Sequence, residues 1–378
     1  MPTQRHLYER LRDTELDHEL SWSESDLPER ERTKHVHRLH PYLGKFVPQL
    51  VEIFLHRSFG PGQWILDPFS GSGTTLVECS TFGAHSVGVD ISAFNALLAR
   101  AKTAVANPFV VEHDLRSALG CFERALPATE GIPTTESTFL REWYDARALS
   151  ELLLYRSFVA HYESAELLSV VLSRAARSAR LTTHTGLDFP KRPQREPYTC
   201  AKHGRVCTPT REAAKFLRRY TLDTIRRVRA YERVRTDAEA IVIHGDARTV
   251  AYTTVFDGLI TSPPYPGRID YHEQHRYAYE LFGLVDRREE EIGAATRGTS
   301  RTAVASYVDA MVAVFDNARR SLRPGAPVIV VVDDARDLYA GILERAGLTL
   351  EGRRKRHVNR RTGRRSGEFF EDIVLARA

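Results

Sequence analysis

Cysteine is scarce in this sequence, with four residues among 378. So few thiols cannot form a disulfide framework for a chain of this length, and their small number favours a reducing compartment. Long apolar runs are also missing, because none approaches the roughly 18 residues that a membrane-spanning helix needs. Residues 1–27 are charged throughout and lack the apolar core of a signal peptide. We therefore expect a cytoplasmic protein with no membrane partner.

Excess positive charge is confined to one segment. The chain carries 54 basic and 49 acidic residues, and eight of the basic residues fall in residues 353–365, which contain no acid. That segment suits contact with a phosphate backbone, and a solvated loop explains it equally well. Hydrophobic residues at 42% and charged residues at 27% are ordinary for a globular protein. The length fits one large domain with an insertion, or two domains.

The most informative stretch is Thr261-Ser262-Pro263-Pro264-Tyr265. It follows an apolar run, residues 255–260, that predicts a buried parallel strand, and open α/β sheets bind ligands where such strands end. The two prolines remove two donors and stiffen the segment, which then presents carbonyl oxygens and side chains. This acceptor cluster suits a planar ring with an exocyclic amine. The Ser262 hydroxyl and the Pro263 carbonyl would accept the amine hydrogens, and Tyr265 would stack on the ring. A plain turn after a strand is the alternative.

A second loop lacks a glycine that dinucleotide-binding proteins need. Residues 64–67 predict an apolar strand that ends in Asp67, and Gly71 and Gly73 follow it. The dinucleotide fingerprint has a third glycine at the position that Leu76 occupies here. The loop therefore favours a different nucleoside ligand over a nicotinamide dinucleotide.

The segments after this loop continue an alternating α/β pattern. A helix is predicted over residues 74–82, with Gly83 as its C-cap. The next predicted strand, residues 86–90, ends in Asp90. Its distance from the glycine loop is the spacing at which a carboxylate accepts ribose hydroxyls. Capping the helix over residues 95–104 is a compatible second role for this side chain.

These segments resemble the motifs of the DNA amino-methyltransferases. The Ser-Pro-Pro-Tyr form is similar to motif IV of the members that methylate the N4 amine of cytosine, whereas Asp or Asn in the first position is more usual for adenine. Residues 67–75 resemble motif I, which binds S-adenosylmethionine. Residues 40–48 resemble motif X, which lines the methionine end of that cofactor. The predicted strand over residues 240–244, with Asp246 after it, resembles motif III, whose acid faces the adenine.

The resemblance covers residues 40–105 and 240–378, about half of the chain, and it implies two sets of site residues. The catalytic set is Ser262, Pro263, Pro264 and Tyr265. The cofactor set is Tyr42, Lys45, Phe46, Asp67, Pro68, Phe69, Gly71, Gly73, Thr74, Thr75, Asp90, Ile91, Asp246 and Thr261.

The fold that the resemblance implies is a seven-stranded, mainly parallel sheet of the class I (Rossmann-like) methyltransferase type, with one reversed strand near its edge. The strands expected from the sequence are residues 64–67, 86–90, 240–244, 255–261, 328–332, 348–351 and 372–375. The expected organisation is a charged N-terminal arm (1–34), a cofactor-binding half (35–106), a mainly helical insertion (107–238) and a catalytic half (239–378) with the basic loop 353–365. The insertion is a candidate target-recognition region, although it precedes the strand before Asp246 instead of following it.

Basic side chains in the insertion and the catalytic half are candidates for contact with DNA. Solvated charged faces are the general alternative. The basic candidates are Arg174, Arg177, Lys191, Arg192, Arg268, Arg354, Arg356 and Arg360, and Tyr271 is a further candidate for contact with the flipped nucleotide or its phosphates.

The insertion also holds three potential zinc ligands, Cys200, His203 and Cys207. A structural zinc site normally has four ligands, and no fourth partner is adjacent in the sequence. A pair of core thiols is the default interpretation, so we expect no metal.

The sequence predicts a site-specific methyltransferase that moves a methyl group from S-adenosylmethionine to the N4 amine of cytosine in double-stranded DNA. The base must leave the duplex first. A cognate restriction endonuclease could accompany the enzyme. Methylation of adenine N6, or of an amine in RNA, is the alternative within enzymes. A non-catalytic DNA-binding protein of the same fold is the third hypothesis, and Asp90 and Ser262 argue against it.

Overall fold

The computed structural model describes residues 18–23, 25–44, 47–126, 134–187, 190–267, 269–358 and 370–378. Four candidate site residues lie outside these ranges: Lys45, Phe46, Arg268 and Arg360. Residues 1–17 of the expected N-terminal arm and residues 359–365 of the expected basic loop also lie outside them.

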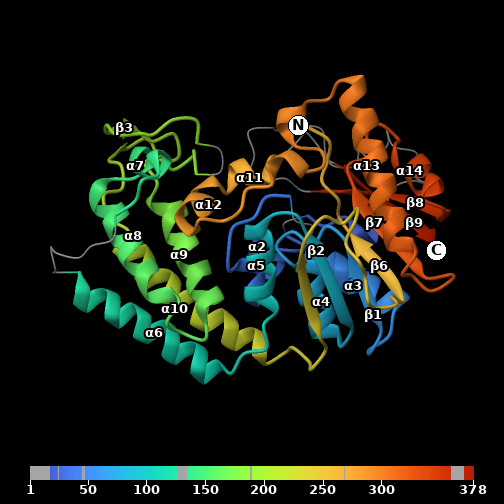
Figure 1. Cartoon of the computed structure of the whole chain (residues 1–378), viewed down its shortest axis with the longest axis horizontal. Helices are drawn as coiled ribbons and strands as arrows, with labels where there is room; N and C mark the ends of the chain where they lie inside the picture. The colour runs from blue at the N-terminus through green and yellow to red at the C-terminus, as the bar shows by residue number, and fades with distance from the viewer. Residues whose placement is uncertain are drawn as a thin grey trace.

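A seven-stranded sheet with the order β5-β2-β1-β6-β7-β9-β8 lies at the centre of the fold (Figure 1). Its neighbouring strands are parallel except at β9, which is antiparallel to β7 and β8. The strands are β1 (Trp64–Asp67), β2 (His85–Asp90), β5 (Ala240–His244), β6 (Gly258–Thr261), β7 (Pro327–Val332), β8 (Thr349–His357) and β9 (Phe370–Arg377). The predicted fold class is confirmed, including the reversed strand near the edge.

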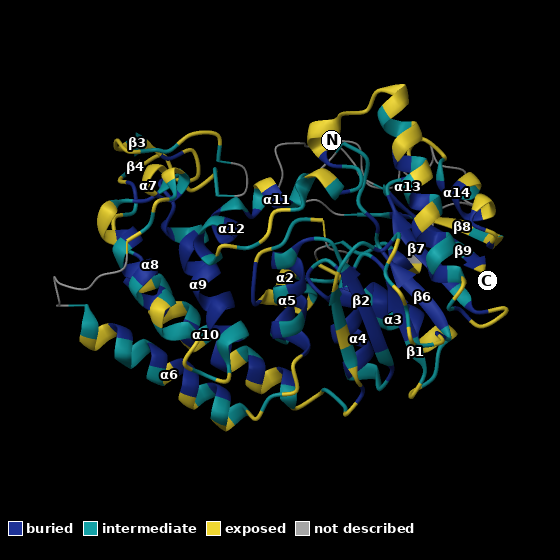
Figure 2. Cartoon of the chain, viewed as in Figure 1, coloured by how far each residue is buried: buried dark blue, intermediate teal, exposed yellow. Residues whose placement is uncertain are grey.

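Helices cover both faces of the sheet because its central strands are apolar on both sides. Along β7, Val328 and Val330 pack on one face and Ile329 and Val331 on the other, as the two-residue period of a strand requires. The first face is covered by α13 (Arg301–Arg319) and α14 (Tyr339–Arg345). The second is covered by α3 (Pro48–Ser58), with α4 (Thr74–Phe82) and α5 (Ala93–Thr103) beside it. Figure 2 shows the strands as a buried layer between these helices.

The predicted insertion forms a helical lobe beside the sheet (Figure 1). Its helices share one apolar core with α5 and with α12 (Arg276–Phe282) of the catalytic half. The lobe consists of α6 (Pro108–Ala125), α7 (Thr138–Trp143), α8 (Ala146–Val159), α9 (Ala165–Ala179) and α10 (Ala214–Glu232). Between α9 and α10, β3 (Tyr198–Thr199) and β4 (Val206–Cys207) form a short antiparallel hairpin.

Two segments differ from expectation. β8 continues to His357, so the first basic residues of the expected loop belong to a strand. Residues 18–22 are anchored, because Leu20 is fully buried and Trp22 forms a bridge with Val358 beyond β8. Residues 286–303, a polar segment to which the sequence assigned no role, contain two 3-10 turns and the start of α13. Within the described residues, no helix is both long and apolar enough to cross a membrane.

Candidate active site

A cavity lies over the carboxyl ends of β1, β2, β5 and β6, which are neighbours in the sheet. It encloses about 790 Å³, including the part open to solvent. The predicted site residues that line it are Tyr42, Pro68, Phe69, Gly71, Thr74, Asp90, Ile91, Asp246, Ser262, Pro264 and Tyr271. Parallel strands therefore bring together segments that are far apart in the sequence, as the predicted motifs require.

The glycine loop approaches the cavity closely. Gly71 has φ of +50°, and a Cβ atom there would lie 3.1 Å from the Tyr42 hydroxyl. Gly73 has φ of +80°, and a Cβ atom there would lie 3.0 Å from the Ala99 backbone of α5. Only a residue without a side chain fits either position. Gly71 keeps the cavity wall open, whereas Gly73 lets the loop pack against a helix.

Asp90 forms part of the cavity wall and is held by the surrounding backbone. Its Oδ2 accepts the Gly71 N–H at 2.9 Å, and its Oδ1 accepts the Ser92 N–H at 2.8 Å. The Asn95 amide also donates to Oδ1 at 3.2 Å. Burial raises the pKa of Asp90 to about 6. Ser92 caps α5 by accepting the Asn95 N–H, so Asp90 is not the cap residue.

Asp67 and Thr261, both predicted cofactor ligands, do not line the cavity. The Thr261 hydroxyl donates to Asp67 Oδ1 at 2.6 Å, and both side chains are buried. Burial raises the pKa of Asp67 to about 6. The bond joins the end of β1 to the end of β6, so it fixes the glycine loop relative to Ser262. Gly73, Thr75 and Pro263 are likewise not part of the cavity lining.

Asp246 lines the cavity at the end of β5. Its two carboxylate oxygens accept hydrogen bonds from Arg248 Nε at 2.9 Å and Nη2 at 2.6 Å. Burial alone would raise its pKa, but the hydrogen bonds from Arg248 lower it. The carboxylate is therefore ionised at neutral pH and acts as an acceptor.

Tyr265 is half-buried and is not part of the cavity lining. Its hydroxyl donates to Glu371 Oε1 at 3.2 Å, and the Ser262 side chain hydrogen-bonds to Tyr265. Arg356 Nε and Nη2 donate to Glu371 Oε2 at 2.9 and 2.7 Å. Burial, together with Glu371, raises the pKa of Tyr265 well above its usual range. These contacts hold the Tyr265 hydroxyl beside Ser262, and the stacking of its ring on a base stays a prediction.

The same contacts correct the prediction for Arg356. Its side chain was expected to contact DNA phosphates, but the residue is only 2% exposed and its guanidinium is paired with Glu371. Arg356 lies on β8 with its side chain directed into the protein, next to Trp22. A buried, paired guanidinium cannot reach a phosphate.

Aromatic residues form another wall. The rings of Tyr42 and Tyr271 are stacked, with centroids 5.6 Å apart and an interplanar angle of 13°. The Tyr42 hydroxyl accepts a hydrogen bond from the Asn95 amide at 3.0 Å, and the Tyr271 N–H donates to Glu291 Oε1 at 2.9 Å. Tyr271, predicted as a DNA contact, is thus part of the cavity itself.

The sequence analysis missed several lining residues. Glu290, Glu291 and Ile292 belong to the polar segment 286–303, and nothing in its composition indicates contact with the site. Asn95 lies in the first turn of α5, five residues after Asp90, to which its amide donates. The remaining missed residues are Gly44, Ser70, Ser72, Ser92, Gly245 and Ala247.

The prediction for Arg174 of α9 is corrected as well, whereas the prediction for Arg177 stays untested. Arg174 is 7% exposed, pairs with Asp223 of α10 at 2.8 Å, and lies over the Tyr220 ring. Arg177, on the same helix, is half-buried. The Arg174 side chain packs within the lobe, where its pairing with Asp223 offsets part of the cost of burying its charge. Lys191, Arg192 and Arg354 are exposed, and their contact with DNA stays a prediction.

Several known proteins are similar to this chain. A family model described as DNA methylase, of the N6/N4 class, matches residues 3–100. Type II methyltransferase M.MjaII from Methanocaldococcus jannaschii is 34% identical over 429 residues, which cover 92% of this chain and 81% of that protein. Type II methyltransferase M.MvaI from Kocuria varians is 23% identical over 39% of this chain and 35% of that protein.

Solved structures of lower similarity were also found. TrmN from Thermus thermophilus has a TM-score of 0.35 and 12% identity, covering 89% of this chain and 50% of that one. The rRNA methyltransferase aviRa from Streptomyces viridochromogenes has a TM-score of 0.32 and 13% identity, covering 90% of this chain and 88% of that one. At these TM-scores the likeness carries no argument about the site.

Proposed function

This chain belongs to the N6/N4 family of DNA methylases, and from that premise we propose that it transfers a methyl group from S-adenosylmethionine to the N4 amine of cytosine within a specific DNA sequence. One observation carries the proposal: a single cavity joins the glycine loop after β1 to Ser262 and Pro264 after β6. A methyl donor and an amine held in these two places would be neighbours, which is the arrangement that direct transfer needs.

The cavity residues fit S-adenosylmethionine. Gly71 leaves room for a ligand beside Tyr42, since a side chain there would meet the tyrosine hydroxyl. Asp90 would accept ribose hydroxyls, and the ionised Asp246 would accept the adenine amine. When bound, the cofactor supplies an electrophilic methyl group.

Ser262 and its neighbours would hold the target amine. Its hydroxyl donates toward Tyr265, so its lone pairs are available to accept one amine hydrogen. The Pro263 carbonyl, predicted as the second acceptor, belongs to a buried residue outside the cavity lining, so binding of the base would have to expose it. The Tyr307 hydroxyl donates to the Pro264 carbonyl at 2.9 Å and fixes the segment. Acceptors on both amine hydrogens direct the nitrogen lone pair toward the methyl donor. The choice of cytosine over adenine rests on serine in the position where adenine methylases more usually have Asp or Asn.

The DNA product tests the proposal. Unmodified plasmid DNA is incubated with the enzyme and S-adenosylmethionine, digested to nucleosides and analysed by mass spectrometry. We expect N4-methylcytosine. N6-methyladenine would instead assign adenine as the target, and methylated nucleosides in structured RNA alone would assign RNA. Absence of any methylated product, with no calorimetric heat of cofactor binding, would favour a non-catalytic DNA-binding protein.

Cofactor binding should strengthen as the pH rises through about 6. The ionised Asp90 carboxylate accepts two ribose hydroxyls, whereas the protonated acid loses one acceptor site, so binding favours ionisation. Because the pKa of Asp90 is about 6, the Kd should fall by about tenfold from pH 5 to 7 and then level off. Isothermal titration calorimetry across this range measures the effect.

The Asp90→Asn variant should bind the cofactor about tenfold more weakly at pH 7.5 and lose most of the pH dependence. Asp67→Asn is the matched control, because the Asp67 carboxyl has a similar pKa but does not line the cavity. It should keep the pH dependence. If the cofactor Kd of Asp90→Asn changed with pH as steeply as that of the wild type, Asp90 would be excluded as the titrating group.

A further inference from the structure

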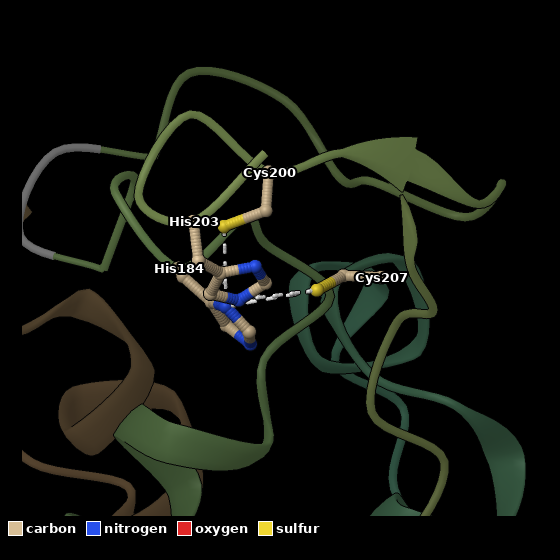
Figure 3. Close-up of side chains that lie close together, drawn as sticks. All are labelled: His184, Cys200, His203 and Cys207. Atoms are coloured by element: carbon tan, nitrogen blue, oxygen red, sulfur yellow. Dashed lines mark hydrogen bonds between the residues drawn. The ribbon is translucent and has the colours of Figure 1, made fainter. Parts of the chain in front are cut away.

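Four potential metal ligands converge in the loops between α9 and α10. His184 joins Cys200, His203 and Cys207, and their ligand atoms all lie within 4.8 Å of one another. Figure 3 shows the four side chains pointing toward a common centre. His184 is the fourth partner that the local sequence does not offer, since it lies in the segment before the hairpin.

The distances between these atoms match the edges of a tetrahedral zinc site. Cys200 Sγ lies 3.4 Å from His184 Nδ1, and Cys207 Sγ lies 3.9 Å from the same nitrogen. Cys207 Sγ lies 3.6 Å from His203 Nε2. Bonds of about 2.3 Å to sulfur and 2.0–2.1 Å to nitrogen, at tetrahedral angles, place sulfur and nitrogen about 3.6 Å apart.

The hairpin has little else to stabilise it. β3 and β4 contain two residues each, and residues 201–206 between Cys200 and Cys207 are all exposed. The turn is closed by backbone bonds, with the Cys200 N–H donating to the Arg205 carbonyl and the Gly204 N–H donating to the Cys200 carbonyl, both at 2.8 Å. An isolated hairpin of this size is not stable in water without a further constraint.

The surroundings do not fit a pair of core thiols. Cys200 is buried, but Cys207 is only half-buried, and His184 and His203 are exposed. Two thiols and two imidazoles that converge at a partly exposed site are donors that zinc prefers.

We propose that His184, Cys200, His203 and Cys207 bind one zinc ion as a closed structural site. Two sulfur and two nitrogen donors in tetrahedral positions are typical of zinc, and four protein ligands leave no position for a substrate. On binding, each thiol loses its proton, so two protons are released and the ion gains two Zn–S and two Zn–N bonds. The ion would tie the hairpin to the segment that follows α9. This inference is independent of the proposed methyl transfer.

Metal content tests the site. Full-length protein purified without chelators, or reloaded with one equivalent of zinc and then gel-filtered, should contain about one zinc per chain by mass spectrometry of the metal. Cys207→Ser should reduce bound zinc by about tenfold or more. Cys121→Ser is the matched control, because Cys121 is half-buried on α6 and outside the cluster. It should retain the full zinc content.

Cobalt substitution identifies the ligands even where a variant loses local structure. The cobalt-loaded protein should show the intense visible bands of tetrahedral coordination and near-ultraviolet thiolate charge transfer. His203→Cys should keep one metal ion and strengthen the charge-transfer band. Zinc below about a tenth of an equivalent after reloading would overturn the proposal. So would unchanged cobalt spectra in Cys207→Ser, or an intact mass showing a Cys200–Cys207 disulfide in freshly purified protein.

Discussion

Replacing Ser262 with alanine should slow methyl transfer about 100-fold and leave cofactor affinity within about twofold of the wild type. The hydroxyl is half-buried at the cavity wall and hydrogen-bonds to Tyr265. Alanine removes an acceptor for the amine at the point where its lone pair must be directed. Because this contact is made at the reacting nitrogen, the loss should appear in the single-turnover rate at saturating DNA, and not in KM alone.

Two further variants test whether the slower methyl transfer comes from the Ser262 hydroxyl. Ser150→Ala, on the exposed side of α8, should leave the rate unchanged, because its hydroxyl bonds only to the Ala146 carbonyl in its own helix. Tyr265→Phe should slow transfer about tenfold, because Ser262 loses the oxygen that orients it. If Ser262→Ala transferred methyl groups at the wild-type rate, the serine would have no part in holding the amine.

Replacing Arg356 with methionine should lower the free energy of unfolding by about 3–5 kcal/mol. The substitution leaves Glu371 buried without its ionic partner, and Glu371 in turn binds Tyr265. If Arg356 contacted DNA, the same substitution would weaken DNA binding and reduce the dependence of the binding constant on salt concentration. The free energy of unfolding would then change little. Urea denaturation followed by circular dichroism measures the change.

Arg354→Met is the matched control, because Arg354 lies on the same strand and is exposed. Its effect on the free energy of unfolding should be below about 1 kcal/mol. The double variant Arg356→Met/Glu371→Leu should regain most of the lost stability, since no unpaired charge remains. A stable Arg356→Met protein with weakened DNA binding would restore the original prediction for this residue.

The helices and strands predicted most accurately are those whose bounds follow from residues close together in the sequence. The helix Thr74–Phe82 lies between Gly73 and Gly83, which both have left-handed backbone conformations. It begins and ends at the residues that the two glycines predict. The strands β1 and β7 are largely apolar runs, which are typical of buried parallel strands. Because β5, β2, β1 and β6 lie side by side and run parallel, the motifs that follow them meet at one edge of the sheet.

The predictions that failed depend on contacts between distant segments. The spacing of Arg174 and Arg177 places them on one face of a helix, but it does not say whether that face meets solvent or Asp223 of another helix. Arg356 is similar, because its partner Glu371 lies on the neighbouring strand. Likewise, no spacing rule connects His184 to the hairpin, and only the fold brings it there.

The anchoring of Leu20 and Ser21 has a practical consequence for anyone who shortens or extends the amino end. The Leu20 carbonyl accepts a hydrogen bond from Arg356 at 3.4 Å, and the Ser21 hydroxyl accepts the His357 N–H at 3.0 Å. From there the contacts continue through Glu371 and Tyr265 to the serine at the reaction centre. Trimming the chain past Trp22 would thus impair turnover by removing the contacts that Leu20 and Ser21 make with β8.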